Sequence, residues 1–222
     1  MAYSNNIAEL RTAAYAPALN KVLRNTYILL SMTLLFSAAT ATASAALGLP
    51  YPGILVTLVG YFGLLFLTQR LRNSNWGLLS VFALTGFMGY TLGPILNVYA
   101  TLPNGAQVIA MALGTTGVSF LGLSAYAIVS RRDFSFMGGF LCVGIVVAFC
   151  LGLAAYFFSM PALSLAVSAM FVLLMAGLIL FETNRIITGG ETNYVMATVT
   201  LYVSLYNLFT SLLHLFGALG DE

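Results

Sequence analysis

The sequence predicts an all-α integral membrane protein, a seven-transmembrane-helix bundle with the seventh helix central. Composition is the first reason, because 60% of the 222 residues are hydrophobic and only 6% are charged, whereas soluble domains carry roughly a quarter charged residues. A soluble globule of this size needs polar groups over its surface, so lipid must surround these apolar side chains. The second reason is a series of seven apolar segments, each close to the roughly 20 residues that cross a bilayer.

Short connections rich in proline, glycine and asparagine separate the seven segments, and none has room for a soluble domain. The segment 53–68 is the shortest, so we expect it to borrow residues from its flanks. The predicted spans are residues 26–47, 53–68, 77–98, 108–129, 136–158, 162–181 and 195–216.

The positions of lysine and arginine orient the bundle. All of them lie before the first span or after the second, fourth and sixth spans, and positive residues favour the cytoplasmic side. We therefore expect a cytoplasmic N-terminal tail (residues 1–25), a seven-helix transmembrane domain (26–216) and a short periplasmic C-terminal tail (217–222). The basic residues are Arg11, Lys21, Arg24, Arg70, Arg72, Arg131, Arg132 and Arg185.

Small residues recur at helix-packing intervals in four of the spans. Close backbone approach drives helix association in lipid, so they predict helix contacts within the chain, with a homodimer face as the alternative. Gly93 and Pro94 should kink or terminate the third span. Cys142 and Cys150 lie about 12 Å apart along one helix, too far for a disulfide, and we expect them to pack. The small residues are Ser37, Ala41, Ala45, Gly89, Gly93, Gly114, Gly117, Gly138, Gly139 and Gly144.

The seventh span is polar on nearly every side, because its hydroxyl and amide residues cannot share one face at about 100° per residue. A helix of this kind cannot face lipid, so we expect it at the centre, ringed by the other six. The residues are Thr198, Thr200, Tyr202, Ser204, Tyr206, Asn207, Thr210 and Ser211.

Glu182 is the candidate for a proton or cation site, because it directly follows an apolar run at the cytoplasmic end of the sixth span. An acid at membrane depth is costly and indicates function, and desolvation disfavours its charged form. The alternative is an ion pair with Arg185, three residues on, or with Arg70 or Arg72.

Two further titratable residues, Glu191 and His214, have ordinary structural explanations. Glu191 lies near the start of the seventh span, where an acid interacts favourably with the helix dipole. His214, the only histidine, is a candidate pH switch or a solvated interfacial residue.

No feature indicates an enzyme, and we expect no catalytic residue, cofactor or metal site. One histidine and two distant cysteines do not form a metal-binding pattern, and neither a G-x-S-x-G motif nor a glycine-rich phosphate loop is present. The scattered basic residues form no nucleic-acid patch. The tail from Met1 to Asn25 is the longest stretch available to a cytoplasmic partner, with an interfacial helix as the alternative.

Four segments resemble the bacterial YccA-like branch of the Bax inhibitor (TMBIM) family: residues 21–31 (KVLRNTYILLS), 93–97 (GPILN), 181–194 (FETNRIITGGETNY) and 201–207 (LYVSLYN). The resemblance covers essentially the whole chain. It implies seven helices with the last one central, in the bacterial inner membrane. It also implies two functions: YccA-like members bind and inhibit the membrane AAA protease FtsH, whereas other members are pH-regulated calcium leak channels gated by an aspartate pair between the sixth and seventh helices.

The sequence departs from the leak-channel pattern in the seventh helix. Glu182 matches the acid of the sixth helix, but the second position is Ser204. A Glu–Ser pair lacks the like-charge interaction that makes two carboxylates share a proton, and calcium prefers six to eight oxygens. We therefore expect a modulator of FtsH that associates with it and its membrane partners. A proton-regulated calcium or cation leak involving Glu182, Ser204, Asn207, Glu191 and Arg185 is the alternative, and a homo-oligomer stays open.

Overall fold

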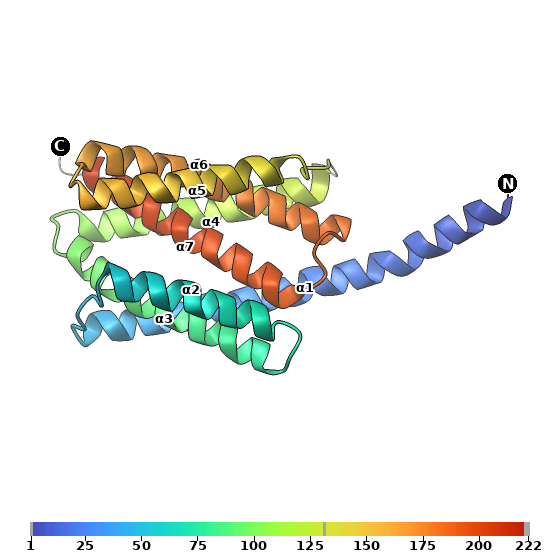
Figure 1. Cartoon of the computed structure of the whole chain (residues 1–222), viewed down its shortest axis with the longest axis horizontal. Coiled ribbons are helices and arrows are strands. Elements are labelled where there is room, and N and C mark those ends of the chain that lie inside the picture. Colours follow the sequence, from blue (N-terminus) through green and yellow to red (C-terminus); the bar gives the residue numbers. More distant parts are fainter. Residues whose placement is uncertain (1, 131, 220–222) are drawn as a thin grey trace.

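The described residues of the computed structural model form seven helices and no strand (Figure 1). The structure describes residues 2–130 and 132–219, with side chains from residue 21 onward. Seven helical segments, the first of them Lys21–Ala46, are long and apolar enough to cross a membrane. The helices are α1 (Ala2–Ala46), α2 (Ile54–Leu71), α3 (Trp76–Ala100), α4 (Gly105–Ser130), α5 (Met137–Phe157), α6 (Pro161–Thr188) and α7 (Tyr194–Leu219).

Helix α7 lies at the centre of the bundle. In Figure 1 it runs between α4, α5 and α6 on one side and α1, α2 and α3 on the other. A larger share of its residues is buried than in any of the other six spanning helices. The prediction from its polar side chains is therefore confirmed.

Six of the seven helices are longer than the predicted spans, and the extensions of α2 and α6 matter for the candidate site. Helix α2 continues to Leu71, so the shortest span does gain residues from its C-terminal flank. Helix α6 continues seven residues past the predicted end at Phe181 and stops at Thr188, where Gly189 adopts a left-handed conformation with φ of 79°. Glycine adopts this conformation at little cost and commonly ends helices. Glu182 therefore lies within α6 and not at its end.

Helices α1 and α3 approach most closely at two glycines of α3. A Cβ atom on Gly89 would clash with the Ser37 carbonyl of α1, and one on Gly93 would lie 2.7 Å from the Ala41 carbonyl. The packing prediction is confirmed for these residues. By contrast, Gly114 and Gly117 of α4 face open space, so they make no close helix contact with the described residues.

Pro94 does not terminate α3, which continues to Ala100, so that part of the prediction is wrong. Proline lacks the N–H that would bond to the carbonyl four residues earlier, and this leaves the Tyr90 carbonyl without its helical partner. The Ser44 hydroxyl of α1 donates a hydrogen bond to that carbonyl at 2.9 Å. A neighbouring helix thus replaces the missing bond, as polar side chains do in membranes.

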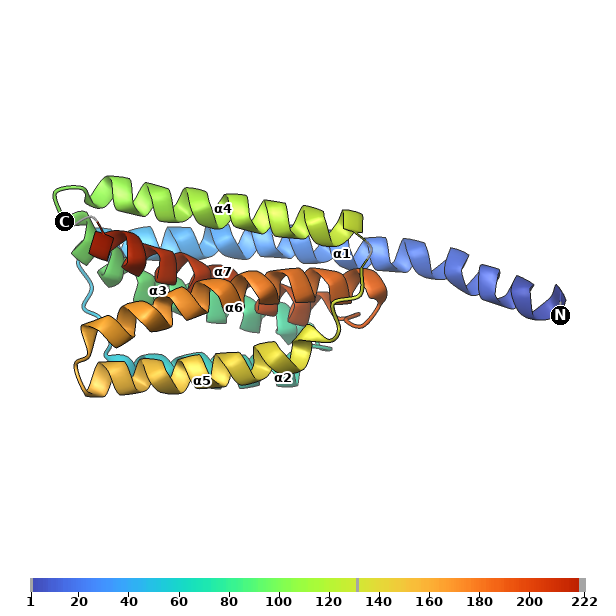
Figure 2. The ribbon, with the colours of Figure 1, turned by 90° about the horizontal axis from the view of Figure 1, so that it is seen from above.

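Cys142 and Cys150 are free and exposed on α5. Because α5 is at the periphery of the bundle (Figure 2), both thiols face its surroundings. The expectation that they pack in the interior is wrong, although the absence of a bond between them agrees with their spacing.

The backbone of the predicted tail is helical from Ala2 and projects beyond the bundle as the first part of α1 (Figures 1 and 2). Predictions that concern Met1, Arg131 and residues 220–222 lie outside the described residues, as does the side chain of Arg11. The division into a tail, a transmembrane domain and a periplasmic end stays a prediction.

Replacing Ser44 by Ala should destabilise the bundle by about 1 kcal/mol, because the part-buried Tyr90 carbonyl loses its donor. Thermal unfolding of the purified protein in detergent measures the loss. Thr42→Ala is the matched control, since the exposed Thr42 hydroxyl bonds only to the Ala38 carbonyl of its own helix. Equal unfolding temperatures for S44A and T42A would contradict the role given to Ser44.

Candidate functional site

Glu182, Arg185 and Glu191 form a charged cluster where α6 meets the connection to α7. The Arg185 guanidinium donates a hydrogen bond to Glu182 Oε2 at 3.0 Å and lies 3.5 Å from Glu191 Oε2. It also donates to the Gly190 carbonyl at 3.3 Å. Of the three arginines considered for Glu182, the structure therefore selects the one on the same helix.

The two acids of the cluster differ in exposure. The Glu182 side chain is 1% exposed, whereas that of Glu191 is 17% exposed and that of Arg185 is 34% exposed. Arg185 also lies 5.6 Å from the centre of the Phe181 ring, at cation–π distance. Arg185 thus reaches from the surface to the one buried carboxylate among the described residues.

One oxygen of Glu182, Oε1, is buried with no hydrogen-bond partner among the described residues. The hydroxyls of Thr183 and Thr26 are in the same condition. A buried carboxylate oxygen without a partner is costly. Such an arrangement can take up a proton or a polar ligand, but a single carboxylate that is already paired with arginine is a poor calcium site.

Ser204 and Asn207 are not joined to Glu182 by any hydrogen bond among the described residues. The Ser204 hydroxyl donates its only proton to the Thr200 carbonyl at 2.7 Å, so it cannot also donate to a carboxylate. Asn207 donates to the Val203 carbonyl at 2.8 Å. The structure thus brings Glu182, Arg185 and Glu191 together and leaves the two predicted α7 residues outside the cluster.

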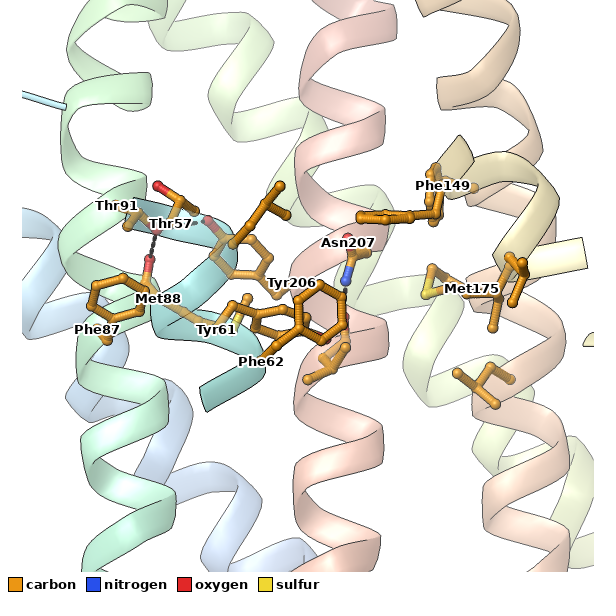
Figure 3. A pocket seen from close by; sticks show the side chains of 16 residues that line it. Thr57, Tyr61, Phe62, Phe87, Met88, Thr91, Phe149, Met175, Tyr206 and Asn207 are labelled. Carbon is orange, nitrogen blue, oxygen red and sulfur yellow. Dashed lines mark hydrogen bonds between the residues drawn. The ribbon is translucent and has the colours of Figure 1, made fainter. Parts of the chain in front are cut away.

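Asn207 instead lines a lateral cavity of about 390 Å³ (Figure 3). The cavity is mostly apolar and is bordered by α2, α3, α5, α6 and α7, with the Tyr61 and Tyr206 side chains among its lining. Tyr206 also lines a second lateral cavity of about 510 Å³, which involves α1, α3, α4 and α7. Tyr206 of the central helix therefore forms part of the wall of both cavities.

Two tyrosines of α7 connect the central helix to α1 and α3. The Tyr202 hydroxyl lies 2.6 Å from the Ser37 hydroxyl and donates to the Thr85 carbonyl. Tyr206 lies 3.2 Å from the hydroxyl of Thr91, which itself donates to the Met88 carbonyl, so Tyr206 is the donor. The sequence identified both tyrosines as polar but could not identify their partners.

Asn193, which the sequence analysis missed, fixes the connection between α6 and α7. Its side-chain oxygen accepts hydrogen bonds from the N–H groups of Val195 and Met196 at the start of α7, and its own N–H donates to Glu191 Oε1 at 2.8 Å. The signal was an asparagine directly before an apolar helix, a typical N-cap. Glu191 thus lies just before α7, as its interpretation required.

Asn184 performs a similar task at the connection between α4 and α5. Its side-chain amide donates to the Arg132 carbonyl at 2.7 Å, and its oxygen accepts a hydrogen bond from the Phe134 N–H. In the same connection, hydrogen bonds from the side chain and the backbone N–H of Ser135 lower the pKa of the exposed Asp133 carboxyl. Two connections therefore meet near the C-terminal part of α6, close to Glu182.

His214 is half-buried and lies 2.8 Å from the Ser168 hydroxyl of α6, with Nδ1 facing it. The Ser168 hydroxyl donates its proton to the Ser164 carbonyl at 3.0 Å. The histidine is thus hydrogen-bonded within the bundle, in contrast to the simpler interpretation of a fully solvated residue.

Replacing Arg185 by Gln should destabilise the protein by about 3 kcal/mol, because it leaves the buried Glu182 carboxylate without its counter-charge. Adding Glu182→Gln to that variant should restore most of the stability, since no charge is then buried. Thermal unfolding of the single and double variants in detergent measures both effects. A double variant no more stable than R185Q would show that the buried charge is not the cause.

Residues 19–221 match the protein family described as "Inhibitor of apoptosis-promoting Bax1". The chain is 58% identical over 198 residues to an Escherichia coli K12 protein named "Modulator of FtsH protease YccA", covering 89% of this chain and 90% of the relative. An Escherichia coli O6:H1 protein with the same identity and coverage is named "Inner membrane protein YccA". An uncharacterized Pseudomonas aeruginosa protein is 55% identical over 201 residues, 90% of each chain. These matches confirm the resemblance stated from the sequence, and the chain belongs to the Bax inhibitor family as a YccA-like member.

Proposed function

We propose that this protein resides in the bacterial inner membrane, where it binds the membrane AAA protease FtsH and inhibits it. The observation that carries this proposal is the 58% identity, over nearly all of both chains, to the relative named as a modulator of FtsH. The names of the relatives describe a modulator and membrane proteins rather than an enzyme, which supports a regulatory function.

The proposed mechanism is occupancy of the protease. The bundle docks beside FtsH within the membrane and offers the tail from Met1 to Asn25 to the protease, while the packed bundle resists extraction. The projecting N-terminal part of α1 supports this proposal, because its backbone extends well beyond the other helices (Figure 2). This requires the tail to be cytoplasmic, as the distribution of lysine and arginine predicts.

The contacts of α1 with α3 and α7 explain why the bundle would resist extraction. Pulling on α1 would have to break its close contact with α3 at Gly89 and Gly93 and its hydrogen bonds to α7 and α3. In hydrocarbon a freed polar group finds no water to replace its lost partner. Unfolding that begins at α1 therefore meets a large cost at its first step.

Deleting residues 2–20 should abolish inhibition of FtsH while the shortened protein still inserts in the membrane, because the bundle from Lys21 onward keeps all seven spans. Degradation of a membrane substrate by FtsH in reconstituted vesicles measures inhibition, and co-purification in mild detergent measures association.

The control replaces residues 2–20 by an unstructured polar sequence of equal length. Loss of inhibition with the deletion but not with the replacement would assign the effect to tail length, and loss with both would assign it to the tail sequence. Full inhibition by the deletion variant would contradict the role of the tail, and failure of the intact protein to co-purify with FtsH would contradict the proposed function itself.

A second candidate function is a proton-regulated leak of calcium or other cations, which the buried and unpartnered Oε1 of Glu182 favours. Protonation of Glu182 would weaken its pairing with Arg185 and free the end of α6 to move. The absence of a second acid at Ser204 and the engagement of the Ser204 hydroxyl with Thr200 both count against the leak.

The leak function predicts that the purified protein in vesicles releases calcium with a pH dependence between about pH 6 and pH 8, and that Glu182→Gln abolishes this dependence. Asp133→Asn is the matched control, since it removes a fully exposed acid that lies outside the charged cluster. A calcium-sensitive dye inside the vesicles measures the flux. No release at any pH in this range would eliminate the leak.

A further inference from the structure

A polar hollow of about 410 Å³ lies at the C-terminal end of α2, apart from the charged cluster and from both lateral cavities. It is lined by Phe66, Gln69, Arg70, Arg72 and Asn73. Its lining contains two cationic and two amide side chains and no acid. The electrostatic character of the hollow is therefore that of an anion site.

The charges of Arg70 and Arg72 are not neutralised within the described part of the chain. The two ion pairs found there both belong to Arg185, which engages Glu182 and Glu191. The remaining acid with a described side chain, Asp133, lies in the connection between α4 and α5 and is fully exposed. Arg70 and Arg72 thus line one hollow, and no acid with a described side chain pairs with either.

The hollow lies at the depth of the membrane interface, because Arg70 occupies the last turn of the spanning helix α2. Phe66, one turn toward the membrane interior, is 71% exposed, and Trp76, at the start of α3, is 64% exposed. Exposed aromatic rings next to basic residues are typical of the level at which lipid headgroups lie. A phosphate near the two arginines would have its acyl chains beside Phe66.

We propose that this hollow binds the phosphate headgroup of an anionic phospholipid. The arginines pair with the phosphate, and arginine suits phosphate because its planar fork donates two parallel hydrogen bonds. Gln69 and Asn73 add neutral polar groups suited to a hydroxylated headgroup. The exposed Phe66 ring contacts the first methylenes of an acyl chain.

The bound lipid is linked to the charged cluster through Asn193. The two hydrogens of the Asn193 amide nitrogen are donated to the Arg72 carbonyl at 3.2 Å and to the Asn73 side-chain oxygen at 2.8 Å. Asn193 also bonds to Glu191 and caps α7. The connection between α2 and α3, beside the lipid site, is therefore hydrogen-bonded to the connection between α6 and α7, which carries Glu191. Lipid binding therefore steadies the connection between α6 and α7.

The test compares phosphatidylglycerol with phosphatidylcholine, titrated onto the delipidated full-length protein and counted as bound lipids by native mass spectrometry. The wild-type protein should bind phosphatidylglycerol preferentially, and the Arg70→Gln, Arg72→Gln double variant should bind it roughly thirtyfold more weakly, as expected for two cationic side chains at a membrane surface. Arg132→Gln is the matched control, an exposed arginine on the same predicted side and outside the hollow, and should change the affinity less than twofold.

Three outcomes would overturn the site. The first is equal binding of the two lipids, and the second is an R132Q variant that binds lipid as weakly as the double variant. The third is binding of inorganic phosphate as tight as binding of the lipid, which would indicate a site for free anions. Hydrogen–deuterium exchange tests the link separately. Phosphatidylglycerol should slow exchange in residues 191–196 of the wild type but not of Asn193→Ala, and equal slowing in both would refute the link through Asn193.

Discussion

Helix α7 carries hydroxyl and amide groups on almost every side, and in a hydrocarbon medium each of them needs a partner from the protein. The serine and threonine side chains mostly solve this locally, by bonding to the carbonyl four residues earlier, as Thr198, Ser204 and Thr210 do. The longer tyrosines cannot do so and reach instead to α1 and α3. This division satisfies the polar groups of α7 at the centre of the bundle and bonds the central helix to α1 and α3.

The same requirement explains how far the sequence predicts the fold. Apolar length predicted all seven spans, and the polar residues of α7 predicted its central position. The predicted termination of the third span at Pro94 is wrong because the group that replaces the missing hydrogen bond, the Ser44 hydroxyl, belongs to a helix about 50 positions earlier in the chain. The local sequence shows that a proline removes a helical hydrogen bond, but it does not show which distant side chain donates in its place.

The charged cluster shows a similar limit. Sequence reasoning identified Glu182 as a costly acid and named Arg185, Arg70 and Arg72 as possible partners, but it could not choose among them. The choice depends on the continuation of α6 to Gly189, which places Arg185 on the same helix face as Glu182 and close to Glu191. Among the described residues, Arg70 and Arg72 form no ion pair, although the sequence places all three arginines after even-numbered spans.

The contact between His214 and Ser168 restricts the chemistry of this histidine. The Ser168 hydroxyl has a single proton. When the Ser164 carbonyl accepts it, the hydrogen between Ser168 and His214 belongs to Nδ1. In this Nδ1–H tautomer an added proton goes to Nε2 on the opposite edge, and protonation of His214 then adds a charge without breaking its link to α6.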